Sequence, residues 1–227
     1  MALAIATDSD RVCALDVRRF DRLWRRSARP GRTADGGPVY RQLVAHYLCA
    51  GRYYHTPDHV RHCVQQLDLA RAHVPNPDAV ELALWFHDVI YVPAAGDNEL
   101  RSADWFATVA QSVMRESLIQ RVHDLIMVTV HPSCPDDLDS QFVVDVDLSS
   151  FALPWARFKS DSRNVRREMV HLSDDQFFGG QMRFLRALLE RPAFFLTDFF
   201  RERSEAIARD NITRVLEDLS AQGYSSN

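Results

Sequence analysis

The sequence predicts an all-α fold, a compact multi-helix domain over residues 1–227 with its core at roughly 15–220. Apolar residues recur at three- and four-residue spacing in almost every segment between breaks, as on a helix face. No clean alternation of apolar and polar residues predicts a strand. A chain of 227 residues is also long enough to bury a sizeable core. Together these observations favour a single helical domain.

The expected helices follow one another along nearly the whole chain. In the first, Phe20 and Trp24 lie four apart and share a face. Two further helices begin at Pro57 and at Pro77, because proline suits the first helical turn. The remaining helices show the same apolar spacing. Apart from the two that begin at proline, the expected helices span residues 12–28, 39–51, 98–112, 116–130, 155–172, 174–191 and 198–221.

Three breaks separate these helices: residues 28–38, 92–97 and 132–139, each rich in glycine, proline or aspartate. The segment Phe142–Val144 has strand propensity, but its place between helices favours a buried helix. The domain is therefore expected to be helical throughout.

Composition excludes several classes of protein. Hydrophobic residues make up 46% and charged residues 26%, as in an ordinary soluble globular protein. The net charge of −4 and the dispersed basic residues argue against a nucleic-acid polymer as partner. Neither a signal peptide nor an apolar run of about 18 residues is found, so we expect a cytoplasmic protein that does not bind a membrane. The spacing of the four cysteines predicts reduced, mostly buried thiols.

Metal-ligating side chains gather in apolar surroundings at two places. His55 and His59 are four apart, so on a helix they would share a face. His87 and Asp88 lie within Trp-Phe-His-Asp-Val-Ile, where burying them is costly unless something satisfies them. A divalent cation would do so.

A third and a fourth place add carboxylates. Asp145 and Asp147 stand in an apolar run that would otherwise be core. They compete for one role, and the Leu-Ser that follows favours Asp147. Asp97 and Glu99 lie shortly after the His-Asp pair. They could act near a metal or serve only at a helix N-terminus.

The order His, His-Asp, Asp on separate helices resembles the HD superfamily. The segments Tyr-His-x-x-x-His-Val, Phe-His-Asp-Val-Ile-Tyr and Asp-x-Asp-Leu are similar to a bacterial branch of predicted metal-dependent HD phosphohydrolases. The resemblance extends to Asp97–Ala103, to Thr129 with His131, to the segment 165–168 and to the segment 208–211. Two departures, Thr56 for Asn and Gln181 for Arg, bear on the substrate more than on the metal.

The resemblance implies an HD-domain fold and assigns metal ligation to His59, His87, Asp88 and Asp147. Two imidazoles and two carboxylates suit Mn, Fe, Ni, Co, Zn or Mg. We expect one such divalent ion, or two. The expected reaction is hydrolysis of a small phosphorylated substrate, such as a phosphate ester or a nucleotide.

Further residues receive expected roles in this hydrolysis. His55 is the candidate general acid toward the leaving oxygen, as in the similar segment of cyclic-nucleotide phosphodiesterases. Glu99 or Asp97 would orient or deprotonate the attacking water. Arg166 is a candidate clamp for phosphate, because a guanidinium binds two oxygens at once. His131 is a candidate contact to the substrate.

Two alternatives stay open. Some HD-fold proteins hold a di-iron centre and use O₂, which would need extra ligands such as His131 and His123. The third possibility is a non-catalytic module that binds a metal or a nucleotide without turnover. The sequence leaves the oligomeric state undetermined.

Overall fold

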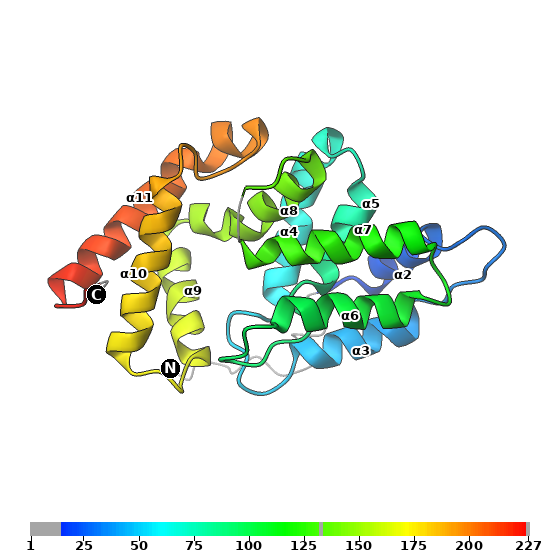
Figure 1. Ribbon diagram of the computed structural model, residues 1–227, viewed down its shortest axis with the longest axis horizontal. Coiled ribbons are helices and arrows are strands. Elements are labelled where there is room, and N and C mark those ends of the chain that lie inside the picture. Colours follow the sequence, from blue (N-terminus) through cyan, green and yellow to red (C-terminus); the bar gives the residue numbers. More distant parts are fainter. Residues whose placement is uncertain (1–14, 132–133, 226–227) are drawn as a thin grey trace, which may run out of the picture.

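A computed structural model describes residues 15–131 and 134–225, and every regular element in these ranges is a helix (Figure 1). The expected all-α fold is thus confirmed. The α-helices of these ranges are α2 Val17–Arg26, α3 Gly37–Tyr47, α4 Pro57–Ala70, α5 Pro77–Phe86, α6 Asn98–Ala110, α7 Glu116–Met127, α8 Leu138–Leu148, α9 Trp155–Glu168, α10 Asp174–Glu190 and α11 Asp198–Ala221. Three short 3₁₀-helices join them: η1 Arg71–His73, η2 Val128–Val130 and η3 Ser149–Ala152.

Helix α5 is the centre of the core. All its residues from Ala79 to Phe86 are buried, because α4, α7 and α8 pack around it. A helix surrounded in this way is apolar on every side. Its one charged residue there, Glu81, is 1% exposed and accepts hydrogen bonds from Arg19 and Arg71. Helix α5 therefore ends, at the His-Asp pair, deep inside the molecule.

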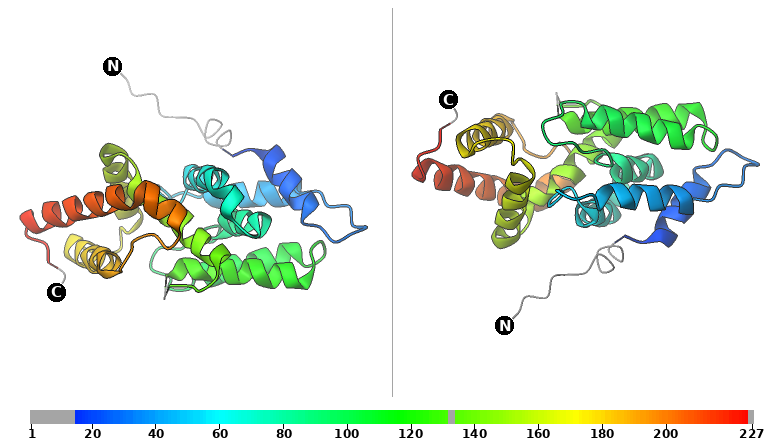
Figure 2. Two further views of the ribbon diagram at one scale, coloured as in Figure 1. Left: turned by 90° about the horizontal axis from the view of Figure 1, so that it is seen from above. Right: turned by 90° about the horizontal axis from the view of Figure 1, so that it is seen from below.

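The last three helices form one end of the molecule, and α2 lies toward the other (Figures 1 and 2). Helix α11 packs against α10 and η3. The Asn211 amide of α11 donates to the carbonyl oxygens of Phe151 and Leu153, at 2.8 Å each. This contact fixes the connection between α8 and α9, and with it the wall beside the candidate site.

The helix starts at Pro57 and Pro77 are confirmed, and α11 has the predicted bounds. Residues 142–144 lie in α8, so the helical assignment of this segment is confirmed. The expected helix at 155–172 was too long, because α9 ends at Glu168 and a turn precedes α10. Residues 132–133 of the expected loop lie outside the described residues.

The prediction of mostly buried cysteines is wrong for two of the three described ones. Cys63 is buried, whereas Cys49 and Cys134 are exposed as free thiols; Cys13 lies outside the described residues. Among the described helices none is both long and apolar enough to cross a membrane.

Candidate metal centre

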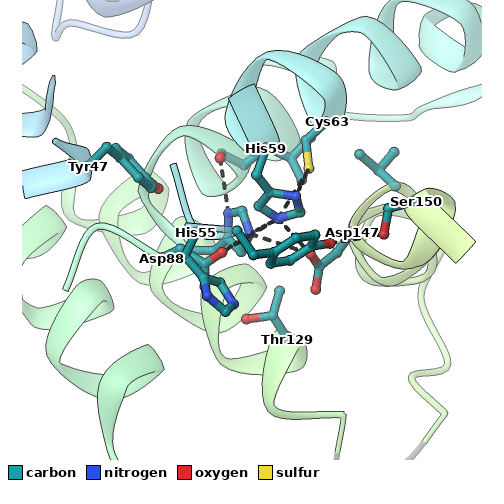
Figure 3. Close-up of polar contacts among 12 residues, drawn as sticks. Tyr47, His55, His59, Cys63, Asp88, Thr129, Asp147 and Ser150 are labelled. Atoms are coloured by element: carbon teal, nitrogen blue, oxygen red, sulfur yellow. Dashed lines mark hydrogen bonds and ion pairs between the residues drawn. The ribbon is translucent and has the colours of Figure 1, made fainter. Parts of the chain in front are cut away.

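Side chains from α4, from the C-terminus of α5 and from α8 converge on one buried point, and Figure 3 shows His59 and Asp147 among them. The Nε2 atoms of His59 and His87 lie 3.1 Å apart. The Oδ1 atom of Asp147 lies 3.2 Å from His59 Nε2 and 3.4 Å from His87 Nε2. Both imidazoles are almost wholly buried, at 5% and 1% exposure. Three potential ligand atoms are thereby held within one coordination sphere.

Asp88 completes this arrangement. Its Oδ2 atom lies 3.0 Å from His87 Nε2 and 3.5 Å from His59 Nε2. Metal bonds of about 2.1 Å place neighbouring ligand atoms about 3.0 Å apart in octahedral geometry and about 3.4 Å apart in tetrahedral geometry. The separations in the cluster match this range, and the mixed nitrogen and oxygen donors suit a divalent transition metal or Mg²⁺. The residues present therefore fit a cation.

Cys63 brings a sulfur to the same place. Its Sγ atom lies 3.7 Å from His59 Nε2, and it forms a compact group of potential ligands with His59, His87 and Asp147. Cys63 follows His59 by one helical turn on α4, so the two side chains share a face. Burial raises the pKa of the Cys63 thiol well above its usual value. A metal ion would have to displace the proton of this thiol, whereas the carboxylates are already charged and need no such step.

The helix ends set the positions of the ligands. His59 lies in the first turn of α4, which Pro57 begins, and His87 caps the C-terminus of α5 with Asp88 directly after it. Asp147 comes one residue before the end of α8. His87 Nδ1 lies 3.0 Å from the carbonyl oxygen of Leu84, which fixes the ring and leaves Nε2 toward the cluster.

The electrostatics of the cluster favour positive charge. Burial lowers the pKa of His87, but Asp88 and Asp147 outweigh burial and hold this pKa well above its usual value. Burial opposes ionisation of Asp147, yet hydrogen bonds from the surrounding histidines hold its pKa well below the usual range. Two carboxylates thus stay charged in a buried place. A bound metal cation would stabilise these two buried carboxylates, in the same way as the protonated imidazoles do without it.

His55 lies beside the cluster, but not where the spacing suggested. Helix α4 begins at Pro57, so His55 belongs to the preceding loop and does not share a helix face with His59. The expectation of a common face was wrong, because Thr56 is the N-cap and ends the loop. Glu168 Oε2 instead holds His55 Nδ1 at 2.5 Å, and the ring stacks on Tyr91.

Glu168 fixes the His55 loop through its backbone as well. Its Oε1 atom accepts hydrogen bonds from the backbone N–H groups of Tyr53, Tyr54 and His55, at 2.5, 2.7 and 3.0 Å. A carboxylate only accepts, so His55 carries its proton on Nδ1 and leaves Nε2 for other partners. Burial lowers the pKa of His55, but Asp88 and Glu168 outweigh it and raise the pKa.

Arg52 joins the two loops that carry these groups. Its guanidinium donates to the carbonyl oxygens of His55 and Asp88, at 3.2 and 2.7 Å, and to that of Val89 at 2.8 Å. Arg52 is only 7% exposed and lies over the rings of Tyr47 and Tyr91. Its charge thus holds the His55 loop against the end of α5.

His131 reaches the cluster from a strained position. Its φ of 55° and ψ of 40° lie in the left-handed region, which is costly for any residue but glycine. Its Nε2 atom lies 3.3 Å from Asp147 Oδ2. Its Nδ1 atom is buried without a hydrogen-bond partner among the described residues. Strain of this kind is typical of functional sites.

The structure separates the competing carboxylates. Asp145 is fully buried and accepts hydrogen bonds from the backbone N–H groups of Leu196 and Thr197 and from the Thr197 hydroxyl, at 2.7 Å each. It ties α8 to the start of α11 and points away from the cluster. Asp147 belongs to the cluster, as the sequence favoured. Glu99 lines the pocket in front of the cluster, whereas Asp97 is exposed and does not.

Arg166 and two histidines lie apart from the cluster. The Arg166 guanidinium is held by Asp174 and by the carbonyl oxygens of Met169 and Leu172, and it does not line the pocket. Its role as a phosphate clamp stays a prediction. His62 pairs with a serine of η3 at 2.9 Å, and His123 lies 3.5 Å from Asp104 on the far side of α7. Of the candidate extra ligands, only His131 is close.

A cavity of about 460 Å³ opens in front of the cluster. His55, Asp88 and Asp147 line one end of it, together with Glu99 and His131. Mainly apolar side chains of η3, α9 and α10 line the rest, together with a few polar ones. A volume of this size suits a small organic molecule. A ligand in the cavity would lie within reach of the metal-ligating groups.

Three residues with a clear place in the site were missed in the sequence: Cys63, Arg52 and Glu168. Cys63 carried a signal, because it follows His59 at the spacing of one helical turn. Glu168 ended a segment that contributed to the family resemblance, but no role was assigned to it. Arg52 gave no signal, because its partners are backbone carbonyl oxygens.

The described part of the chain is thus a helical fold with a buried cluster of histidine, cysteine and aspartate side chains that could hold a metal ion. No protein-family model, no curated protein and no solved structure matches the chain.

Proposed function

We propose that this protein is a metal-dependent phosphohydrolase of the HD type that acts on a small phosphate compound. The observation that carries the proposal is the convergence of His59, His87, Asp88 and Asp147 next to an oriented His55. The two imidazole Nε2 atoms lie 3.1 Å apart, and a carboxylate oxygen of each aspartate lies 3.0–3.5 Å from both. The order of these motifs in the sequence, which resembles the HD superfamily, supports it independently. The metal ion is divalent, and its identity is open.

The cluster supplies the chemistry that phosphate hydrolysis needs. A divalent cation, when bound, lowers the pKa of water and polarises a phosphoryl oxygen. Two of the four ligands come from α4 and α8 and the other two directly follow α5, so they need little movement to hold an ion. Such preorganisation supports the binding of a phosphoryl group in front of the cavity end that carries His55.

His55 and Glu99 are the proposed acid and base. Water attacks phosphorus, and Glu99 accepts a proton from that water. The bond between phosphorus and the leaving oxygen breaks, and His55 Nε2 gives its proton to this oxygen. Glu168 keeps His55 oriented through Nδ1 and favours its protonated form. Glu99 lines the cavity and Asp97 does not, which makes Glu99 the better candidate for the base.

The two alternatives predict different properties. A di-iron oxygenase would need a second set of ligands. His131 lies near Asp147, but His123 pairs with Asp104 instead. A non-catalytic module would have no use for a histidine oriented by a buried carboxylate. The His55–Glu168 pair therefore favours the hydrolase, and two irons per chain would favour the oxygenase.

Phosphate release from aryl phosphates and nucleotides, by Mn²⁺-loaded protein, tests the proposal. The decisive variant is Glu168→Gln, which keeps the shape but is a weaker acceptor for His55. We expect kcat to fall by about 100-fold, since general acids contribute about 10²–10⁴-fold. The rate should fall less for substrates with good leaving groups, because they need no proton. The matched control is Glu205→Gln. Glu205 also accepts hydrogen bonds from backbone N–H groups, those of Phe194 and Phe195, but it does not line the cavity.

Equal losses for good and poor leaving groups would contradict the role of His55 as acid. No phosphate release from any compound, by protein shown to contain the metal, would contradict the hydrolase itself.

A further inference from the structure

The cavity in front of the cluster has two unlike ends. The end near the metal-ligating groups is acidic, with Asp88, Glu99 and Asp147. The far end is apolar and aromatic, and its wall comes from η3, α9 and α10: Phe151, Phe158, Val165, Phe177, Phe184 and Leu185. A ligand that fills this space must therefore have a polar group at one end and an apolar group at the other.

None of the described residues that line the cavity is a lysine or an arginine, so its basic side chains there are histidines. A substrate with three phosphates would place two of them among carboxylates or against apolar rings, without a cation to offset their charge. Burial of unpaired charge is costly. At the end of the cavity beside the cluster, positive charge is expected from the metal and from the histidines. This charge suffices to offset that of one phosphoryl group.

The wall from α9 and α10 also carries polar side chains, among them Ser162, Gln176 and Gln181. Gln181 of α10 lines the cavity, and its amide nitrogen donates to the Ser162 hydroxyl at 3.1 Å. Its Oε1 atom is buried and accepts no hydrogen bond from the described residues. A buried acceptor without a donor costs free energy, so a ligand that supplies an O–H or N–H group here would be favoured.

From these features we infer the substrate class: a phosphate ester with one phosphate and a large, uncharged, mainly apolar or aromatic organic group that bears a hydrogen-bond donor. The inference rests on the proposed function, since it places the phosphate at the cluster. The organic group fills the space between η3, α9 and α10, where its donor meets Gln181. Phe184 of α10 lines this space and is 43% exposed.

A second groove offers the opposite chemistry. It adjoins His59 on the other side and is lined by polar side chains that include Arg61, Arg157 and Arg167. Two of these arginines already pair with aspartates, and Arg167 lies over Tyr53. Asp88, Asp147 and His55 line the apolar cavity and not this groove. The reacting group is therefore placed toward the apolar side.

The test compares kcat/KM of the Mn²⁺-loaded protein for phenyl phosphate, 2-naphthyl phosphate and ATP. Phenol and 2-naphthol are leaving groups of similar acidity, so we expect 2-naphthyl phosphate to exceed phenyl phosphate by about tenfold, because its second ring buries more apolar surface. ATP should be the poorest of the three. Isothermal titration with uncharged 2-naphthol gives a readout that needs no turnover, and we expect it to bind with or without Mn²⁺.

Two variants test the wall of the cavity. Phe184→Lys should weaken 2-naphthol binding and raise the ratio of ATP to 2-naphthyl phosphate turnover. Ile207→Lys is its matched control, since Ile207 is an exposed apolar residue of α11, 49% exposed, outside the cavity. Gln181→Leu should weaken 2-naphthol binding but not that of naphthalene, which has no donor.

The outcomes separate the inference from the proposed function. If ATP is the best substrate, the inference is wrong while the hydrolase stands, and the arginine-lined groove is the substrate path. If 2-naphthol does not bind, or if Phe184→Lys and Ile207→Lys behave alike, the inference is wrong as well. If the metal-loaded protein hydrolyses none of the three compounds, the proposed function fails and the inference fails with it.

Discussion

At the scale of single residues, Cys63 and Asp88 offer a choice of fourth ligand. Both lie close to His59, but their charge states differ. Burial raises the pKa of the Cys63 thiol well above its usual value, whereas the histidines around Asp88 overcome burial and lower its pKa. Only the deprotonated form of either group binds a metal well. The carboxylate is therefore the expected ligand.

This choice gives a direct prediction. Cys63→Ser should keep the metal content of the wild-type protein. Asp88→Asn should weaken metal binding by more than about 100-fold, because losing a residue that only hydrogen-bonds to a ligand already costs roughly 10- to 100-fold in metal affinity. Mn²⁺ or Zn²⁺ titration followed by calorimetry measures both. Loss of the metal in Cys63→Ser, with normal affinity in Asp88→Asn, would assign the ligand to the sulfur instead.

His131 gives a second prediction, because its backbone is left-handed. We expect His131→Gly to be more stable than His131→Ala by about 1–2 kcal/mol, the cost of this conformation for a residue with a Cβ atom. Both variants lack the imidazole and should lose activity equally. Chemical denaturation measures the free energy of unfolding, and Ala94→Gly, at φ 72°, should show a similar gain without loss of activity. Equal stability of the two His131 variants would mean that the turn relaxes at no cost.

The residue types of the candidate ligands were visible in the sequence, but their partners were not. His59, His87, Asp88 and Asp147 stood out because charged groups in apolar segments need a partner. The carboxylate that orients His55 comes from a position 113 residues away, and local patterns carry no information about such a contact.

At the scale of elements, α8 carries two aspartates with separate tasks. Asp145 accepts three hydrogen bonds at the start of α11, and Asp147, two positions later, faces the cluster. Two residues along a helix correspond to about 200° of rotation, so the side chains leave opposite faces. The helical geometry of α8 therefore decides which aspartate reaches the metal.

This division of tasks predicts opposite phenotypes. Asp145→Ala should lower the free energy of unfolding by about 2–3 kcal/mol, because buried donors lose their acceptor. Asp147→Ala should abolish metal binding and change the stability of the metal-free protein much less. Thermal unfolding in EDTA and metal analysis of both variants measure the difference. The assignment fails if Asp145→Ala loses the metal while its stability is unchanged.

Helix starts were easier to predict than helix ends. Pro57 and Pro77 begin α4 and α5, because proline fits the first turn and needs no hydrogen-bond partner there. The end of α9 at Glu168 was missed by four residues. Nothing local stops the helix at this point. Residues 169–172 instead form the turn where Arg166 binds two carbonyl oxygens, which is a tertiary contact.

At the scale of the whole molecule, the cluster joins α4, α5 and α8, so a bound ion would act as a cross-link in the core. An ion at 100 times its dissociation constant stabilises a folded protein by about 2.7 kcal/mol. For a chain of this size, we therefore expect EDTA to lower the melting temperature by about 5–10 °C. Differential scanning calorimetry measures this shift, and His87→Ala should show none. An equal shift in His87→Ala would place the stabilising ion elsewhere.

The arrangement of the helices also explains how the site obtains its shape. Figures 1 and 2 show α9, α10 and α11 at one end of the molecule, next to the helices that carry the candidate ligands. The Asn211 amide of α11 donates hydrogen bonds to the carbonyl oxygens of Phe151 and Leu153 in and after η3. The cavity lies between α9 and α10 on one side and the helices with the candidate ligands on the other. The sequence predicted each helix but not this assembly, since the packing depends on contacts between distant segments.

Metal analysis by mass spectrometry, on protein purified without a histidine tag, tests the central claim most directly. About one divalent metal per wild-type chain and none in His87→Ala would agree with a centre built on His59, His87, Asp88 and Asp147. The same content in wild type and His87→Ala would contradict that centre, as would the absence of metal from wild-type protein even after Mn²⁺ titration.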